Sequence, residues 1–259
     1  MVKLKNNNVV QFVFVVFLTF LLFSRCGTSK LDITKIEGKQ IPIGSEIESN
    51  QKVVSFIQPY KQHIDQELNS VLAIATETID KSGVWQSPMG NLFSKAVFEK
   101  GNPIFEKREN KTIDFVLLNH GGIRTIIPKG NVTARSAFEI MPFENSLVVV
   151  ALAGEQVEEL LQYFVNEKKP HPLFGISFTI EKNNTVSNIL VQGKPFSKET
   201  TYYVGTNDYL ANGGDNMTFF KKGIQRYNLD YKLRNILIDY FKEVKTLSVD
   251  SSERVKAEP

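Results

Sequence analysis

The sequence predicts an α+β fold in which helices cover at least one sheet. Apolar residues recur every three or four positions over 155–165 and 231–244, which is the spacing of amphipathic helices. Continuous apolar runs at 113–118 and 146–152 have the length of buried strands. Because helical and strand patterns occur together in a chain of 259 residues, we expect both kinds of element to share a substantial core.

The first 25 residues are expected to direct export and not to join this core. Lys3 and Lys5 precede an apolar run from Val9 to Phe23, which is the pattern of a secretory signal. The run is short for a membrane span, which needs roughly 20 residues, and an uncleaved membrane anchor is the alternative. We therefore predict three regions: a signal peptide at 1–25, a polar tether at 26–51 and one folded domain at 52–259.

Cys26, the only cysteine, follows the apolar run directly. The segment L-L-F-S-R-C resembles a bacterial lipobox, in which Cys26 would be lipidated and become the new N-terminus. Arg25 departs from the small residue usual before that cysteine, and the alternative is a free thiol near a cleavage site. Lipidation would imply an exported lipoprotein held to a membrane by its lipid, in the periplasm or at the outer membrane or cell surface.

The formal charge of +3 comes entirely from the signal region. Lys3, Lys5 and Arg25 are its only charged residues, and basic and acidic residues balance in the rest of the chain. Electrostatic binding of nucleic acid needs a basic face. A nucleic-acid partner is therefore not expected.

The first half of the domain is predicted to begin with a helix over 52–71, which Pro59 should bend or interrupt. The apolar run 71–75 either extends this helix or begins a strand, and periodicity alone does not decide. The elements that follow are predicted as a helix at 89–98, a buried strand at 113–118 and a glycine loop at 119–124.

The second half continues the mixture. We predict a short helix at 134–140, a strand at 146–152 and an amphipathic helix at 155–165. Alternating or apolar runs with turn residues between them suit an antiparallel set. Its strands would be 176–180, 186–191 and 202–205, and the last helix would cover 231–244.

Hydrolytic machinery is not expected in this chain. A two-metal site needs several His and Asp ligands clustered in space. The three histidines, His63, His120 and His171, form no Asp-x-His or His-x-His pair, and no phosphate-binding Walker loop or G-x-S-x-G motif is present. We therefore predict no catalytic residue and no metal ligand here.

Recognition groups, in contrast, are present in the segment N-D-Y-L-A-N-G-G-D at 207–215. It sets Asp208, Tyr209 and Asp215 around Gly213 and Gly214. Glycines accept unusual backbone angles and let the backbone approach a ligand closely, so both are predicted to border a substrate. The ordinary alternative is a polar turn after a strand.

Two further segments add to this set. In L-N-H-G-G-I-R at 118–124, Asn119 offers hydrogen bonds, and Arg124 offers a rigid donor fork for phosphate or carboxylate oxygens. In M-P-F-E-N at 141–145, Phe143 follows a proline. Separately, Arg124 suits a surface ion pair and Phe143 suits the core. Together, two aromatic rings, a carboxylate, an asparagine and an arginine fit a nucleoside phosphate.

These segments also carry a family resemblance. Four short motifs occur in the same order as in 5′-nucleotidases and at similar spacing. They are M-G-N-L at 89–92, N-H-G-G-I-R at 119–124, M-P-F-E-N at 141–145 and A-N-G-G-D at 211–215. From about Met89 onward the chain resembles the C-terminal, substrate-binding domain of that family, which includes bacterial UDP-sugar hydrolases and animal ecto-5′-nucleotidases. The resemblance implies a four-layer α/β/β/α sandwich.

The resemblance also implies roles. Asn119 and Arg124 would contact the phosphate and ribose region, Phe143 and Tyr209 would sandwich the base, and Asp215 would bind the ribose hydroxyls. Two departures stand out. Gly83 and Gln86 occupy positions where the family usually has an arginine and an acid, and His120 replaces a glycine. His120 either adds charge below neutral pH or is a bystander.

Complete enzymes of the family carry a metallophosphatase domain with two divalent metals, for which nothing before residue 52 is suited. The first hypothesis is therefore the recognition component of a split 5′-nucleotidase, with the metals in a separate polypeptide. The alternative is a surface nucleoside- or nucleotide-binding lipoprotein without catalysis. A structural lipoprotein with relic site residues is a third option.

Overall fold

Two hydrophobic clusters lie on opposite faces of a five-stranded sheet. The computed structural model describes residues 7–23, 33, 35–44 and 46–258. Neighbouring residues of a strand point to opposite faces, so Val148 joins one cluster and Val149 the other. The strand order is β10 (Gln225–Lys232), β4 (Ser146–Ala153), β9 (Thr201–Asn207), β2 (Phe115–Leu117) and β5 (Leu173–Phe174).

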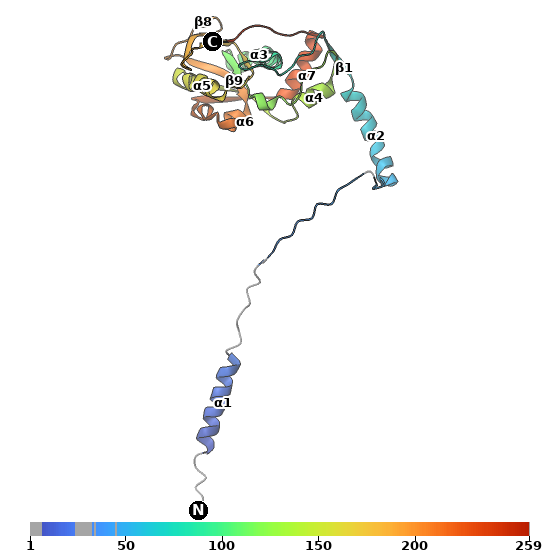
Figure 1. Cartoon of the computed structure of the whole chain (residues 1–259), viewed down its shortest axis with the longest axis vertical. Coiled ribbons are helices and arrows are strands. Elements are labelled where there is room, and N and C mark those ends of the chain that lie inside the picture. Colours follow the sequence, from blue (N-terminus) through green and yellow to red (C-terminus); the bar gives the residue numbers. More distant parts are fainter. Residues whose placement is uncertain (1–6, 24–32, 34, 45, 259) are drawn as a thin grey trace, which may run out of the picture. The chain divides into compact units, whose positions relative to one another are not determined.

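Helices α3 and α7, which lie side by side in Figure 1, cover the first face of this sheet. α3 (Pro88–Glu109) begins where the side chain of Ser87 accepts a hydrogen bond from the Gly90 backbone, and ends at Asn110 in the left-handed conformation. It is longer than the predicted 89–98 because it continues through Pro103. The same cluster includes α4 (Ala134–Ile140), α7 (Leu233–Val244) and a sheet ordered β11 (Thr246–Leu247), β1 (Val71–Ala75) and β3 (Gly130–Thr133).

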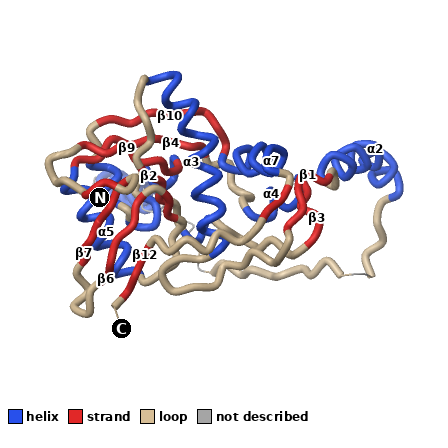
Figure 2. Tube along the Cα trace, turned by 90° about the horizontal axis from the view of Figure 1, so that it is seen from above, coloured by secondary structure: helices blue, strands red, loops and turns tan. Residues whose placement is uncertain are grey.

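The second face is covered by α5 (Gly154–Glu167) and a four-stranded sheet. That sheet has the order β12 (Val255–Ala257), β6 (Ile176–Ile180), β7 (Val186–Val191) and β8 (Lys194–Pro195). Figure 2 shows β6, β7 and β12 as a group apart from β4, β9 and β10. The predicted α+β sandwich of helices and sheets is thus confirmed.

One strand assignment was wrong. The run 202–205 was grouped with β6 and β7, but it belongs to β9 in the central sheet. β9 pairs antiparallel with β4 over its whole length and parallel with β2. The four residues Val204 to Asn207 are all buried, as expected for a strand covered on both faces.

The first domain helix, α2 (Gln51–Leu68), contains Pro59 and has no buried residue. The run 71–75 after it is a strand, which resolves the two alternatives left by the sequence. The apolar side chains of α2 are exposed, including Phe56 at 71%. Its C-terminal end is held to α4 by an ion pair between Asp65 and Arg135, at 2.8 Å. Helical spacing thus predicted this helix, but it did not indicate that the apolar side chains of the helix would be exposed.

The chain divides into two units, Met1–Gln51 and Lys52–Pro259. In the first unit, α1 (Asn7–Phe23) has 17 residues, and Cys26 lies outside the described residues. Within the described part of the chain, no helix is both long and apolar enough to cross a membrane. The signal, tether and lipid assignments stay predictions. The remaining short elements are α6 (Asp208–Ala211) and the 3-10 helices η1 (His120–Gly122), η2 (Gly214–Asn216) and η3 (Thr218–Lys222).

Candidate functional site

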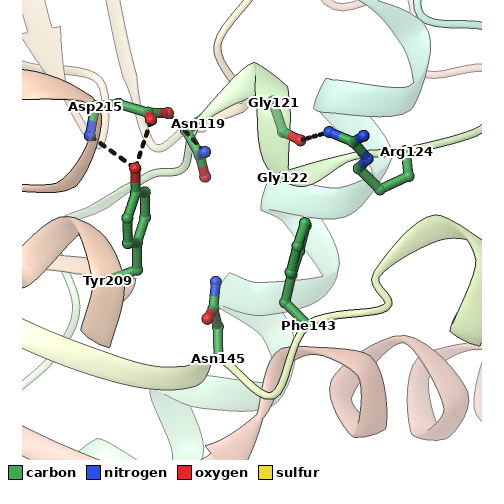
Figure 3. Close-up of a pocket in the computed structure, with 8 residues that line it drawn as sticks. All are labelled: Asn119, Gly121, Gly122, Arg124, Phe143, Asn145, Tyr209 and Asp215. Carbon is green, nitrogen blue, oxygen red and sulfur yellow. Dashed lines mark hydrogen bonds between the residues drawn. The ribbon is translucent and has the colours of Figure 1, made fainter. Parts of the chain in front are cut away.

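A cavity of about 380 Å³ lies where three loops meet at one edge of the central sheet. β2 and β9 are parallel, so the loops that follow them, 119–124 and 207–215, leave from the same edge. β4 is antiparallel to β9, with Leu147 opposite Asn207, so segment 141–145 enters β4 at that edge. The lining residues, drawn in Figure 3, are Asn119, Gly121, Gly122, Arg124, Phe143, Asn145, Tyr209 and Asp215.

The structure therefore brings together five of the side chains predicted to bind substrate: Asn119, Arg124, Phe143, Tyr209 and Asp215. Gly213, Gly214 and Asp208 do not line the cavity. Gly213 adopts a positive φ of 82°, and a side chain at Gly214 would collide with the Tyr209 ring. The two glycines thus allow the turn that places Tyr209 and Asp215, while a direct contact of either glycine with a ligand stays a prediction.

Asp215 is held by hydrogen bonds on both carboxylate oxygens. The Tyr209 hydroxyl donates to Oδ1 at 2.8 Å, and Asn119 Nδ2 donates to Oδ2 at 2.7 Å. The bond to Asp215 raises the pKa of Tyr209, which keeps this hydroxyl protonated as a donor. Tyr163 of α5 donates to the Asp215 carbonyl oxygen at 2.7 Å. These contacts hold the backbone of Asp215 at a φ of 51°, a conformation that only a few non-glycine residues adopt.

Phe143 is presented to the cavity by a loop that α7 anchors. Arg234, at the start of α7, pairs with the Glu144 carboxylate and lies 4.1 Å from the Phe138 ring centre. The hydrogen bond from Arg234 lowers the pKa of Glu144, so the pair stays charged. The Leu233 backbone N–H donates to the carbonyl of Asn145 at 2.9 Å. The loop is therefore fixed although Phe143 itself is 42% exposed.

Tyr209, at 46% exposure, lies across the cavity from Phe143 (Figure 3). Because both rings are about half exposed to water, they do not gain the hydrophobic free energy that full burial would supply. Asn145 lies between them in the same view and also lines the cavity. Its side chain was not among the predicted site residues. Its place immediately before β4, at the end of the M-P-F-E-N segment, is the one sequence signal that marks it.

Arg124 forms the opposite wall from Asp215. Its Nη1 donates to the Gly121 carbonyl at 3.4 Å, and its guanidinium lies 5.9 Å from the centre of the Phe143 ring. Within the described part of the chain, no acidic side chain lies within ion-pair distance of Arg124. Its positive charge is therefore directed to a neutral carbonyl and an aromatic face.

The loop 119–124 rests on a buried histidine. The backbone N–H of His120 donates to Nδ1 of His171 at 3.1 Å, and burial lowers the pKa of His171 to about 4. His171 is therefore neutral near pH 7 and can accept this bond. Burial also lowers the pKa of His120, as does the nearby charge of Lys81. Of the two alternatives for His120, the gain of charge is thus shifted to lower pH.

Gly83, where the family resemblance places an arginine, has a φ of 138°. A side chain at this position would collide with the carbonyl oxygen of Gln86, so no arginine fits this backbone. Gln86, in the place of the expected acid, has a different task. Its Oε1 accepts from the backbone of Arg254 at 2.8 Å and Val255 at 3.2 Å, which fixes the C-terminal segment.

No group of three or more His, Cys, Asp or Glu side chains in the described residues is placed to hold a metal ion. The donor set around the cavity is one carboxylate, two amides, a phenol and a guanidinium. These groups suit hydrogen bonding to a polar organic ligand with an anionic end.

Comparison with known proteins places this geometry in context. Residues 67–222 match the family model described as 5′-nucleotidase, C-terminal domain. The chain is 27% identical over 191 residues to a 5′-nucleotidase of Vibrio vulnificus, covering 70% of this chain and 32% of that protein. It is 26% identical over 195 residues to Protein UshA of Yersinia enterocolitica, covering 72% and 34%. It thus spans about a third of the length of these curated relatives.

Solved structures show a similar fold. The structure of a 5′-nucleotidase precursor from Thermus thermophilus matches with a TM-score of 0.67 and 26% identity, covering 81% of this chain and 43% of that one. The NAD nucleotidase of Haemophilus influenzae matches with a TM-score of 0.62 at 18% identity, covering 81% and 42%, which shows a shared fold alone.

Proposed function

Because this chain belongs to the 5′-nucleotidase C-terminal domain family, we propose that it binds a nucleotide or nucleoside in the cavity formed by loops 119–124, 141–145 and 207–215. One observation carries the assignment: Phe143 and Tyr209, both half-exposed, face the same cavity from opposite sides. A base between two rings gains about 1–3 kcal/mol from stacking on each aromatic.

Asp215 is suited to the ribose. A carboxylate has about four acceptor positions, and Asp215 uses one on each oxygen for Tyr209 and Asn119. One position on each oxygen therefore remains for the vicinal hydroxyls of a ribose. Because the protein contacts already fix the carboxylate, binding costs little additional ordering.

Arg124 completes the proposed site on the phosphate side, and Asn119, which donates to Asp215, serves the phosphate and ribose region. The guanidinium of Arg124 has no acidic partner in the described part of the chain, and its planar fork matches phosphate oxygens. The direct test is calorimetric titration of the full chain with AMP and with adenosine. We expect both to bind at one site, with AMP binding more tightly. A chain that binds neither would contradict the proposal.

The proposed place of this site in a reaction is substrate positioning in a split 5′-nucleotidase. Within the described residues, no group of side chains is placed to bind the family's two divalent metals. We therefore assign these metals, and the water that attacks the phosphate, to a separate metallophosphatase chain. This chain would hold the base and ribose and orient the phosphate toward that partner. Phosphate release from AMP, with Mn²⁺ or Zn²⁺ added, should require both chains. Activity of the purified chain alone would contradict the split.

The alternative is a nucleoside-binding lipoprotein without a catalytic partner. Gly83 favours it, because its backbone has no room for the arginine that the family resemblance places there. Equal affinities for adenosine and AMP would support this alternative, since phosphate recognition would then be lost.

Membrane attachment through a lipid on Cys26, with export to the periplasm or cell surface, is part of the same proposal. Incorporation of labelled palmitate by the native chain, and its loss in Cys26→Ser, is the expected result. Equal labelling of both would contradict lipidation at this residue.

A further inference from the structure

A second positive charge lies beside Arg124 and has no role in the site described above. Lys81 comes from the segment between β1 and α3, and its Nζ donates to the carbonyl oxygen of Ile123. Ile123 stands between Gly122 and Arg124, which both line the cavity. The ammonium of Lys81 is therefore held against the backbone of loop 119–124, next to two cavity-lining residues. Lys81 itself does not line the cavity, and it is separated from Arg124 by more than forty positions in sequence.

The charges of Lys81 and Arg124 are not neutralised by protein groups. Within the described residues, neither has an acidic side chain in ion-pair distance. Partial burial, together with the proximity of Arg124, lowers the pKa of Lys81. Like charges held close together in a partly buried place cost free energy. A bound anion would remove that cost.

The segment that carries Lys81 also lacks the expected arginine. Gly83, two residues later, cannot accept a side chain in its present backbone conformation. A lysine side chain is long and flexible, and its ammonium has three donors. Lys81 can therefore keep its bond to Ile123 and still donate to an anion.

We propose that Lys81 is the second phosphate-binding cation of this site, acting beside Arg124 in place of the arginine absent at Gly83. This role rests on the proposed binding of a nucleotide. The ligand class that it selects is a nucleoside phosphate over the free nucleoside. Ribose and base contacts come from other loops, so Lys81 should affect only the part of affinity that depends on phosphate.

The experiment compares AMP with adenosine by calorimetric titration of the full chain and of Lys81→Gln. A hydrogen bond to a charged group corresponds to a change of about 10- to 100-fold in affinity. We expect the ratio of AMP to adenosine affinity to fall by that factor in Lys81→Gln, with adenosine affinity unchanged. Lys81→Arg should retain most of the ratio of AMP to adenosine affinity, because it keeps a cation of similar reach at this position.

Lys129→Gln is the matched control, since Lys129 carries the same charge and is exposed, and its backbone N–H donates to Thr78 and not to loop 119–124. It should leave the ratio unchanged. Equal loss of AMP and adenosine affinity in Lys81→Gln would show that Lys81 only supports loop 119–124, and no change would exclude any role; either result overturns the inference. If the unmodified chain binds adenosine and AMP equally, phosphate recognition fails while nucleoside binding stands. If it binds neither, the proposed function itself fails.

Discussion

The two walls of the cavity differ in how their charged groups are satisfied. On the wall formed by 207–215, Asp215 accepts hydrogen bonds from Tyr209 and Asn119 at 2.7–2.8 Å. On the wall formed by 119–124, Arg124 donates to one carbonyl at 3.4 Å and lies near Lys81, without an acidic partner in the described part of the chain. The first wall is ordered before a ligand arrives, whereas the second holds positive charge that only an anion would neutralise.

This difference separates two kinds of recognition. A ribose and a base need fixed geometry. The wall formed by 207–215 supplies it, because Tyr163 of α5 and Asn119 donate hydrogen bonds to Asp215. A phosphate needs concentrated positive charge, which the Arg124 wall supplies. Changes on the first wall should therefore weaken nucleoside and nucleotide alike, and changes on the second should act through the phosphate.

The largest expected effect comes from the support beneath the Arg124 wall. His171 accepts the backbone bond of His120, and burial lowers the pKa of His171 to about 4. The unfolded chain binds this proton more tightly, so stability is complete above about pH 6.5 and falls as the pH drops toward 4. We expect the free energy of unfolding to fall by on the order of 3 kcal/mol across that window from this group.

Urea denaturation at several pH values between 7.5 and 4 measures this loss. His171→Asn removes the titrating ring and keeps a carbonyl acceptor for the His120 N–H, so its stability should change less over the same window. The same pH dependence in both proteins would show that His171 is not the responsible group.

Exchange of Asp215 for Asn should have the next largest effect. Asparagine tolerates the positive φ of 51° at this position, so the turn is retained while one acceptor oxygen becomes a donor. We expect adenosine and AMP affinities to fall together by about 10- to 100-fold, measured by calorimetry. Asp208→Asn, on the same segment but outside the cavity lining, is the control. A loss confined to AMP would place Asp215 on the phosphate side and contradict the comparison of the two walls.

The smallest effect is expected for Tyr209→Phe. The ring and its stacking remain, but the bonds with Asp215 Oδ1 and the Asp215 backbone are lost. The ligand keeps its own bonds to Asp215 and has only to order a looser carboxylate, which costs about 1 kcal/mol, so adenosine affinity should fall by about fivefold in calorimetric titration. If Tyr209→Phe were as weak as Tyr209→Ala, the hydroxyl and not the ring would dominate, and the stacking role would be wrong.

Much of the fold could be predicted because its signals are local. Helices α4, α5 and α7 and strand β4 each show a clear apolar pattern in their own residues. β10 was missed because its residues are mostly polar and only Leu229 is buried, and its pairing with β4 is the main reason that it is a strand. β9 was placed in the wrong sheet because a strand pattern does not specify its partner.

The site followed a similar division. Five of the residues that line the cavity were predicted because they lie in short motifs whose order resembles a family: Asn119, Arg124, Phe143, Tyr209 and Asp215. The groups that position them lie elsewhere in sequence: Tyr163 on α5, His171 before β5 and Arg234 on α7. Each supports a loop through contacts that only the fold creates, and no sequence pattern indicates such contacts.

The central claim, that the two rings hold a base, is tested most directly by titrating AMP into the full chain and into the double variant Phe143→Ala, Tyr209→Ala. We expect one molecule of AMP to bind per chain, and a loss of at least about 30-fold in affinity in the double variant, because stacking on each ring contributes about 1–3 kcal/mol. Circular dichroism should show both proteins folded. Equal AMP affinity in the two proteins, or no binding by the unmodified chain, would contradict this account.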